Sequence, residues 1–398
     1  MTHSHLRAIN KFLKLSRDAP LSLTLEFHGP RINISNPNHT PKLITAAFHL
    51  VLDNFHRWRS ITCKTNFELP SIPEGSVAPY LEHVDFEFHY NELQEAAYCR
   101  ALVAAAPNLC SYIDNRPSHI GEVPDQRPWT QFHKFHFSNP IYAKKALFLL
   151  DRAKSLVEFR FVMLYSKNFF LEEPPLFKTT SMIQSMAIIS EYPLELQLFL
   201  SHLDTPNLDS LTLIFPVDRF TRNYRSPRYC SISIFPFLSS ASDSFRLSSL
   251  GLYNLMVDES EFIDCLRILS PSLTDLIIQT EEVFSPLKMV TNNVLKSLTC
   301  NGLTQSEPLC PTLKNLTLKR CVGADDGVLS DMVQSRLSSQ LTVVNKPSYG
   351  TAVAKLTMLR SLNVVFTVHT HPVDEKRLNE FYEKGLNGAV QFAPRGLR

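Results

Sequence analysis

Apolar residues recur along the chain in a short motif with the spacing LxxLxL. The clearest copies run from Leu208 to Leu213, Leu247 to Leu252, Leu273 to Ile278 and Leu313 to Leu318. In an extended chain successive side chains point to opposite faces, so apolar residues two apart lie on the same face. Each copy is therefore predicted to be a short strand with one buried face.

Looser copies with other apolar residues extend this motif over most of the chain. The middle apolar residues of all copies are Leu23, Ile61, Val84, Tyr112, Phe135, Phe159, Met186, Leu211, Leu250, Leu276, Leu298, Leu316 and Leu362. Most steps between them fall near the repeat length of about 20–29 residues that is typical of leucine-rich repeats. The longest step, from Leu316 to Leu362, would be divided into two if residues 341–344 form a further, degenerate copy of the motif.

The segments between these strands carry apolar residues at helical spacing. In one segment Leu196, Phe199, Leu200 and Leu203 have this spacing. In a second segment Phe262, Cys265, Leu266 and Leu269 have it, and Ser260 is the expected N-cap of that helix. A third, shorter segment contains Leu329, Met332 and Val333. Spacings of three, four and seven place side chains on one side of a helix. These segments are predicted to be helices that cover the strands.

Strand and helix in alternation predict an α/β leucine-rich-repeat solenoid, with a parallel β-sheet on the concave face and helices on the convex face. We expect an N-terminal capping helix within residues 1–18, on which Leu6, Ile9 and Leu13 share a face. Residues 19–398 are expected to form a single solenoid domain with an insertion near residues 214–246. The alternative is an ordinary α/β protein that is rich in leucine.

The strand pattern also predicts which side chains face outward on the sheet. They flank the middle apolar residue of each copy, and four of them, Ser249, Asp275, Ile277 and Asn315, are candidate partner contacts. Most residues at such positions are small or polar, and tight interfaces depend on aromatic and arginine anchors. We therefore expect the anchors to come from loops.

The segment Arg219–Tyr229 is the best supplied with such anchors, because it combines arginines with aromatic residues and has no acid. Arg222, Tyr224, Arg225 and Tyr229 are the candidate partner-binding residues of this insertion. Arginine with aromatic side chains also suits stacked nucleic-acid bases, so an RNA-binding repeat protein is the alternative function. A solvated loop with no partner is the simplest explanation of the same composition.

The order of several short motifs resembles the leucine-rich region of the F-box protein families of mushroom-forming fungi. The matching segments include Phe12–Leu23, His56–Ile61, Thr205–Leu211, Leu309–Leu316 and Asp331–Arg336. The resemblance implies the target-recognition part of a substrate receptor of cullin-type ubiquitin ligases, which is not an enzyme. Only one short helix fits before the repeat-like sequence that begins at Pro20, so the F-box itself is missing and docking on the ligase adaptor is not implied.

The composition is that of a folded protein, and the charge balance bears on which classes of partner it can bind. Hydrophobic residues make up 44% of the chain, and 40 Lys and Arg against 38 Asp and Glu leave a net charge of +2. A nearly balanced charge does not favour binding to nucleic acid or to a membrane surface. The sequence has no transmembrane stretch and no apolar leader, so the eight cysteines are expected to be free thiols in the cytoplasm or nucleus.

Catalytic and metal-binding motifs are not found, so no catalytic residue, cofactor or metal is predicted. His369 and His371 could share a strand face, but no third ligand has a helpful spacing, and surface or turn histidines are expected. Cys300, Cys310 and Cys321 recur at similar steps and are expected to be buried apolar thiols, with Cys300 at a strand position.

Overall fold

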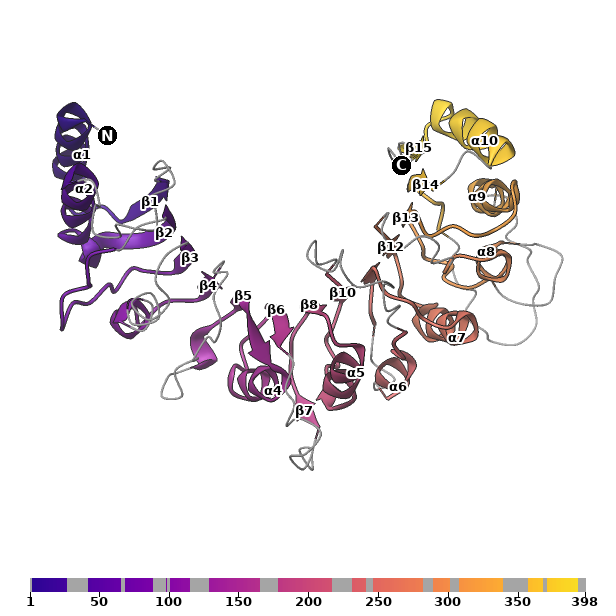
Figure 1. Ribbon diagram of the computed structural model, residues 1–398, viewed down its shortest axis with the longest axis horizontal. Helices are drawn as coiled ribbons and strands as arrows, with labels where there is room; N and C mark the ends of the chain where they lie inside the picture. The colour runs from indigo at the N-terminus through magenta and orange to yellow at the C-terminus, as the bar shows by residue number, and fades with distance from the viewer. Residues whose placement is uncertain are drawn as a thin grey trace, which may run out of the picture. The chain divides into compact units, whose positions relative to one another are not determined.

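The computed structural model describes thirteen parts of the chain and divides into two compact units (Figure 1). The described residues are 2–26, 42–65, 69–88, 98, 101–114, 129–164, 178–216, 231–240, 246–281, 289–300, 308–338, 357–367 and 371–392. Unit 1 is Met1–Leu164 and unit 2 is Tyr165–Arg398. Whether residues 19–398 form one domain stays a prediction.

Unit 1 is an α/β structure whose strands pair in sequence order, all parallel. Its elements are α1 (His3–Leu15), β1 (Leu21–Glu26), α2 (Lys42–Leu52), β2 (Trp58–Thr65), β3 (His83–Phe88), β4 (Ser111–Asp114), β5 (Lys134–Tyr142), α4 (Ala143–Arg152) and β6 (Glu158–Leu164), with 3-10 turns at Phe55–Arg57 and Trp129–Gln131. A helix is therefore present within residues 1–18, as α1, and its role as a cap of the sheet stays a prediction.

Unit 2 repeats strand and helix in the same parallel order, from β8 to β15. Its elements are β7 (Thr179–Thr180), β8 (Ser185–Ser190), α5 (Pro193–Ser201), β9 (Leu203–Asp204), β10 (Ser210–Ile214), α6 (Phe235–Ser239), β11 (Ser249–Tyr253), α7 (Glu259–Leu269), β12 (Asp275–Gln279), α8 (Asn292–Leu298), β13 (Asn315–Lys319), α9 (Val328–Ser338), β14 (Ser361–Phe366), α10 (Pro372–Glu383) and β15 (Asn387–Phe392). In Figure 1 helices α5 to α10 lie on one side of these strands, and successive helices contact one another.

The core follows the alternation of the strands. Leu211, Leu250, Leu276, Leu316 and Leu362 are each at most 1% exposed, as predicted. In the sheet these five leucines stand opposite one another in register. The residues between them are less buried, so one sheet face packs on the helices and the other stays open.

In unit 1 aromatic side chains replace the leucines. Phe135 and Phe137 stack with ring centroids 5.1 Å apart, and Phe159 and Phe161 do so at 4.7 Å. Trp58 is fully buried, and its indole N–H donates to the Val51 carbonyl at 3.1 Å. Aromatic rings bury more area per residue than leucine, which lets a few strands enclose a stable core.

One strand prediction was wrong. Residues Leu295–Cys300 are not a strand, because residues 292–298 form helix α8, so Ser297 and Thr299 do not lie on the sheet. A spacing of three between Leu295 and Leu298 suits a helix as well as LxxLxL, and Thr291 caps that helix by accepting from the Val294 N–H. Leu298 is buried, as expected, but from the helix side, and Cys300 is half-buried beyond the helix end.

The strand β15 was not predicted, because glycine takes the position of the middle leucine. Gly388 stands opposite Leu362 with a φ of 129°, and a Cβ there would lie 1.8 Å from the Leu362 carbonyl oxygen. Only glycine allows this close approach of the two strands. The degenerate copy expected at residues 341–344 lies outside the described residues.

The predicted helices form, with different ends. Helix α7 begins after Asp258, whose side chain accepts from the Ser260 N–H, so Asp258 rather than Ser260 is the N-cap. Helix α5 ends at Ser201, before Leu203. No helix among the described residues is long and apolar enough to cross a bilayer.

Among the described residues, each unit has one buried arginine that binds carbonyl groups. Arg57 in unit 1 donates to the carbonyls of Leu13 and Ala19, at 3.2 and 3.1 Å. Arg336 in unit 2 is fully buried and donates to the carbonyls of Leu298, Leu309 and Cys310, at 2.7–3.0 Å. Burial lowers the pKa of the Arg336 guanidinium, but arginine remains charged in proteins. These arginines satisfy loop and helix-end carbonyls that have no strand partner.

Candidate functional site

The open strand face of unit 2 consists of three rows of side chains, which the register aligns across the sheet. We call these rows the unit 2 face. The first row is Ser185, Ser210, Ser249, Asp275, Asn315 and Ser361; the second is Ala187, Thr212, Gly251, Ile277, Thr317 and Asn363; the third is Ile189, Ile214, Tyr253, Gln279, Lys319 and Val365. Hydroxyl and amide groups dominate the first two rows.

The four candidate residues on this face are brought together. Ser249 stands opposite Asp275, and Asp275 stands opposite Asn315. The Asn315 amide donates to Asp275 Oδ1 at 2.5 Å, and the Thr274 hydroxyl donates to Asp275 Oδ2. Ile277 lies one row further along, opposite Thr317. The carboxylate of Asp275 is therefore held in a fixed position at the centre of the first row.

The four candidates of the insertion, Arg222, Tyr224, Arg225 and Tyr229, lie outside the described residues. Their role as anchors stays a prediction.

The third row supplies apolar anchors that the sequence interpretation missed. Tyr253, Ile214 and Val365 are partly exposed on the same face as the serines. A Cβ on Gly251 would lie 3.1 Å from Tyr253 Cε2, so the tyrosine ring lies against this glycine. Tyrosine is enriched at interface hot spots. Each residue of the third row follows the second row by two positions in its strand, so extending the predicted strands by two residues would have predicted this row.

The open strand face of unit 1 has different chemistry. We define the unit 1 face as Ser60, His83, Ser111, Lys134 and Glu158 in one row and Thr62, Asp85, Ile113, His136 and Arg160 in the next. Most of the side chains from β3 to β6 in these rows can carry a charge. This face is thus an ionic surface, whereas the unit 2 face is mainly neutral.

Glu158 is the centre of the ion pairs on the unit 1 face. It contacts Lys134 Nζ at 3.0 Å and His136 Nε2 at 2.6 Å. Burial lowers the pKa of His136, although Glu158 opposes this shift. For Glu158 burial alone would raise the pKa, but the hydrogen bonds from Lys134 and His136 outweigh it, and the pKa falls. Neutral His136 therefore acts mainly as a hydrogen-bond partner of an ionised Glu158.

A shallow hollow of about 470 Å³ lies on the unit 1 face. Its lining includes His83, Asp85, Cys110, His133 and Lys134. The Cys110 sulfur lies 4.0 Å from His83 Nδ1, but burial, with the charge of Glu82, raises the pKa of this thiol. A thiol that stays protonated is a poor nucleophile. The hollow therefore offers polar contacts without an activated cysteine.

Four other described cysteines are also poor nucleophiles. Burial raises the pKa of Cys63, Cys265 and Cys310 to about 12 and raises that of Cys321 further. Cys310 and Cys321 are fully buried, as predicted.

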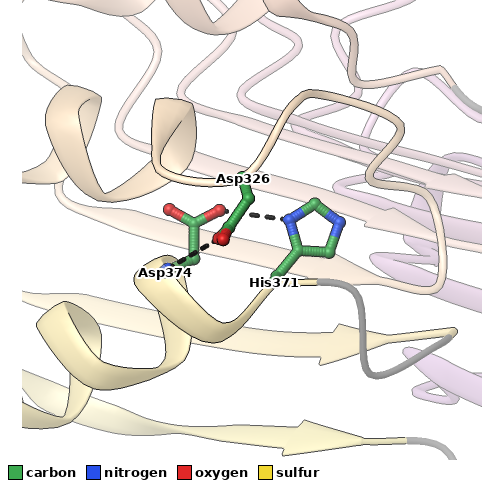
Figure 2. Close-up of side chains that lie close together, drawn as sticks. All are labelled: Asp326, His371 and Asp374. Carbon is green, nitrogen blue, oxygen red and sulfur yellow. Dashed lines mark hydrogen bonds and ion pairs between the residues drawn. The ribbon is translucent and has the colours of Figure 1, made fainter.

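Asp326, His371 and Asp374 form the one mixed cluster of potential metal ligands found among the described residues (Figure 2). One ligand atom from each residue lies within 4.8 Å of the others. His371 was expected to be a surface or turn histidine; it lies at the N-cap of α10 but is only 7% exposed, and its Nδ1 lies 3.2 Å from Asp374 Oδ2. Sequence spacing pointed to His371 with His369, which lies outside the described residues, and missed Asp326, because Asp326 comes from the preceding repeat.

Helix capping accounts for both carboxylates of this cluster. Asp326 precedes α9 and accepts the N–H groups of Val373 and Asp374 at 3.0–3.1 Å, in the first turn of α10. Asp374 is fully buried and accepts the Ser330 N–H, in the first turn of α9, at 2.8 Å. Each helix thus receives a negative charge at its N-terminus from the other repeat, which is stabilising. Since every carboxylate oxygen has a donor or an imidazole partner, the cluster fits a structural role better than a metal site.

No protein-family model matches the sequence, and a search of curated proteins finds no match. Function must therefore be inferred from the residues themselves.

Proposed function

We propose that this chain is a non-enzymatic protein-interaction module, built as a leucine-rich-repeat solenoid that receives a partner on its open strand face. The unit 2 face is the observation that carries this proposal. Its three aligned rows put hydrogen-bonding side chains beside Tyr253, Ile214 and Val365, which is the mixture found at protein interfaces. A catalytic cysteine would need to be activated, and burial instead raises the pKa of Cys63, Cys110, Cys265, Cys310 and Cys321.

Contacts between successive strand ends support the repeat architecture. The Asn254 amide donates to the Phe215 carbonyl of the preceding repeat at 2.9 Å, and its oxygen accepts the Glu281 N–H of the next at 2.8 Å. The Thr280 hydroxyl donates to the Arg320 carbonyl at 2.7 Å. Repeat proteins are stabilised by such interfaces between neighbouring units.

The resemblance to the fungal F-box families suggests target recognition in a cullin-type ubiquitin ligase as the biological setting, in the cytoplasm or nucleus. In this setting the partner is a protein target. Recovery of the ligase adaptor with the chain would be evidence for ligase membership.

The experiment compares bulky substitutions on opposite sides of the same repeats. Tagged chains carrying Ser249→Trp or Thr317→Trp on the unit 2 face are recovered from cells and their partners are quantified by mass spectrometry. Gln334→Trp is the matched control, because Gln334 is exposed on α9, the helix that follows β13. We expect the same partner proteins to be lost with both face variants and retained with the control.

Equal recovery of all partners from the three variants would contradict the proposal. Recovery of RNA in place of proteins would favour the alternative function, an RNA-binding repeat protein.

A further inference from the structure

Helix α1 exposes two large apolar side chains on its outer side. Phe12 is 59% exposed and Leu15 is 71% exposed. Leu6, Ile9 and the buried Leu13 share a different side of the helix, and α1 packs against α2. The exposed pair is therefore a second apolar surface on a helix whose first one is already used.

The outer residues have the spacing of a helix-packing ridge. Ala8, Phe12 and Leu15 stand at positions i, i+4 and i+7, which share one face of a helix. This is the pattern by which an amphipathic helix contacts a partner helix or groove. We call Ala8, Phe12 and Leu15 the α1 ridge.

Positive charge borders the α1 ridge. Arg7, Lys11 and Lys14 are exposed, and the sequence of α1 contains no Asp or Glu. On a helical wheel these three residues lie on one flank of the ridge. The chain as a whole is nearly balanced in charge, so this basic helix differs from its surroundings.

The helix is held firmly at its C-terminal end. Arg57 donates to the Leu13 carbonyl at 3.2 Å and to the Ser16 hydroxyl at 2.6 Å, and that hydroxyl donates to the Leu13 carbonyl at 2.9 Å. A ridge fixed in this way does not need to be ordered when a partner binds, which lowers the entropy lost on binding.

We propose that the α1 ridge is a docking surface for an acidic amphipathic helix of a partner protein. The partner would pack its apolar face on Phe12 and Leu15 and set carboxylates against Lys11 and Lys14. A protein helix fits better than a lipid surface, because two adjacent apolar side chains make a short ridge rather than the broad apolar face that inserts into a bilayer. This surface lies in unit 1 and shares no residue with the unit 2 face.

A synthetic peptide supplies the probe. It is an acidic amphipathic helix of about three heptads, with leucine at the a and d positions and glutamate beside them. Binding to the full chain is measured by fluorescence anisotropy at low and physiological salt. We expect saturable binding that weakens as salt rises, since exposed charges are screened.

Three variants test the assignment. Phe12→Ser with Leu15→Ser removes the apolar pair, and Lys11→Glu with Lys14→Glu reverses the charge; each double variant should weaken peptide binding about tenfold or more. Leu194→Ser is the matched control, because Leu194 is 68% exposed on α5, and it should bind as the unaltered chain does. All these side chains are exposed, so thermal unfolding should be unchanged.

Four results would overturn the proposal. They are absence of peptide binding, full binding by both double variants, equal binding of a peptide with lysine in place of glutamate, and binding only to vesicles containing phosphatidylserine. The last result would assign the α1 ridge to a lipid surface.

Discussion

The unit 1 face and the unit 2 face stand on the same kind of parallel strands but differ in chemistry. Across β3 to β6 the outward side chains are mostly ionisable, and Glu158 joins Lys134 and His136 in ion pairs. Across β8 to β14 the corresponding rows are mostly hydroxyls, amides and apolar groups, with Asp275 fixed by Asn315. Inward residues must be apolar to pack, whereas outward residues are free to vary. The two faces therefore differ in the surface that each unit presents and not in the packing that holds each unit together.

The largest expected effect tests whether the two units share one kind of core. Phe159→Ala in unit 1 and Leu316→Ala in unit 2 each empty a site that is at most 1% exposed. We expect losses of about 3–5 and 2–5 kcal/mol in the free energy of unfolding, because a cavity forms in each core. Urea unfolding measures the loss, and hydrogen exchange shows which unit is affected. A loss of unfolding free energy below about 1 kcal/mol for either variant would contradict the expectation that the two units have equivalent cores.

The buried arginines give a second, smaller test of the same equivalence. Arg57→Met and Arg336→Met keep the length of the side chain but leave buried carbonyls without donors. We expect each to lower the free energy of unfolding by about 2–3 kcal/mol, again by urea unfolding. Replacement by lysine should recover only part of this, because its ammonium lacks the planar fork of arginine. Full stability of either methionine variant would contradict the role assigned to these arginines.

Loss of the Asp326 cap of helix α10, in unit 2, should have a smaller effect on the free energy of unfolding. Asp326→Ala leaves the Val373 and Asp374 N–H groups without an acceptor and should cost about 1 kcal/mol in thermal or urea unfolding. Asp326→Asn keeps an acceptor oxygen and should retain most of the stability.

The same measurement distinguishes the cap from a metal site. Added Zn²⁺ or Mn²⁺ should leave the unfolding temperature unchanged. A saturable rise that Asp326→Ala abolishes would show that the cluster binds metal.

The smallest expected effect concerns pH and only the unit 1 face. Because burial lowers the pKa of His136, the unfolded chain binds this proton more readily than the folded one. The contribution to stability is present above the ordinary histidine pKa of about 6.5 and is lost as pH falls through the lower folded value. Glu158 acts in the same direction at more acid pH, because its pKa is also lowered.

His136→Gln should remove part of this pH dependence, by less than about 1 kcal/mol, since the pair is partly exposed. Unfolding measured between neutral and mildly acid pH checks this, with Thr317→Val on the unit 2 face as a control without a titrating group. An unchanged pH profile in His136→Gln would contradict the assignment.

The strands were predictable from the sequence where an apolar residue fills the middle position, as Leu211 and Leu316 do. The prediction failed where local spacing is ambiguous, at Leu295 and Leu298, and where close strand approach requires Gly388. The reciprocal caps of Asp326 and Asp374 join residues from different repeats, and strand or helix periodicity carries no information about such contacts. For the same reason the pairing of Glu158 with Lys134 and His136 became visible only with the register of β5 and β6.

The most direct test of the central claim, that the open strand face of unit 2 receives a protein partner, is photo-cross-linking in cells. A benzophenone amino acid is placed at Ser249 in β11 or, as the control, at Arg267, which is 62% exposed on α7 of the same repeat. From this claim we expect a discrete cross-linked protein species from position 249 and none from position 267. Cross-links from position 267 alone, or the same species from both positions, would contradict it.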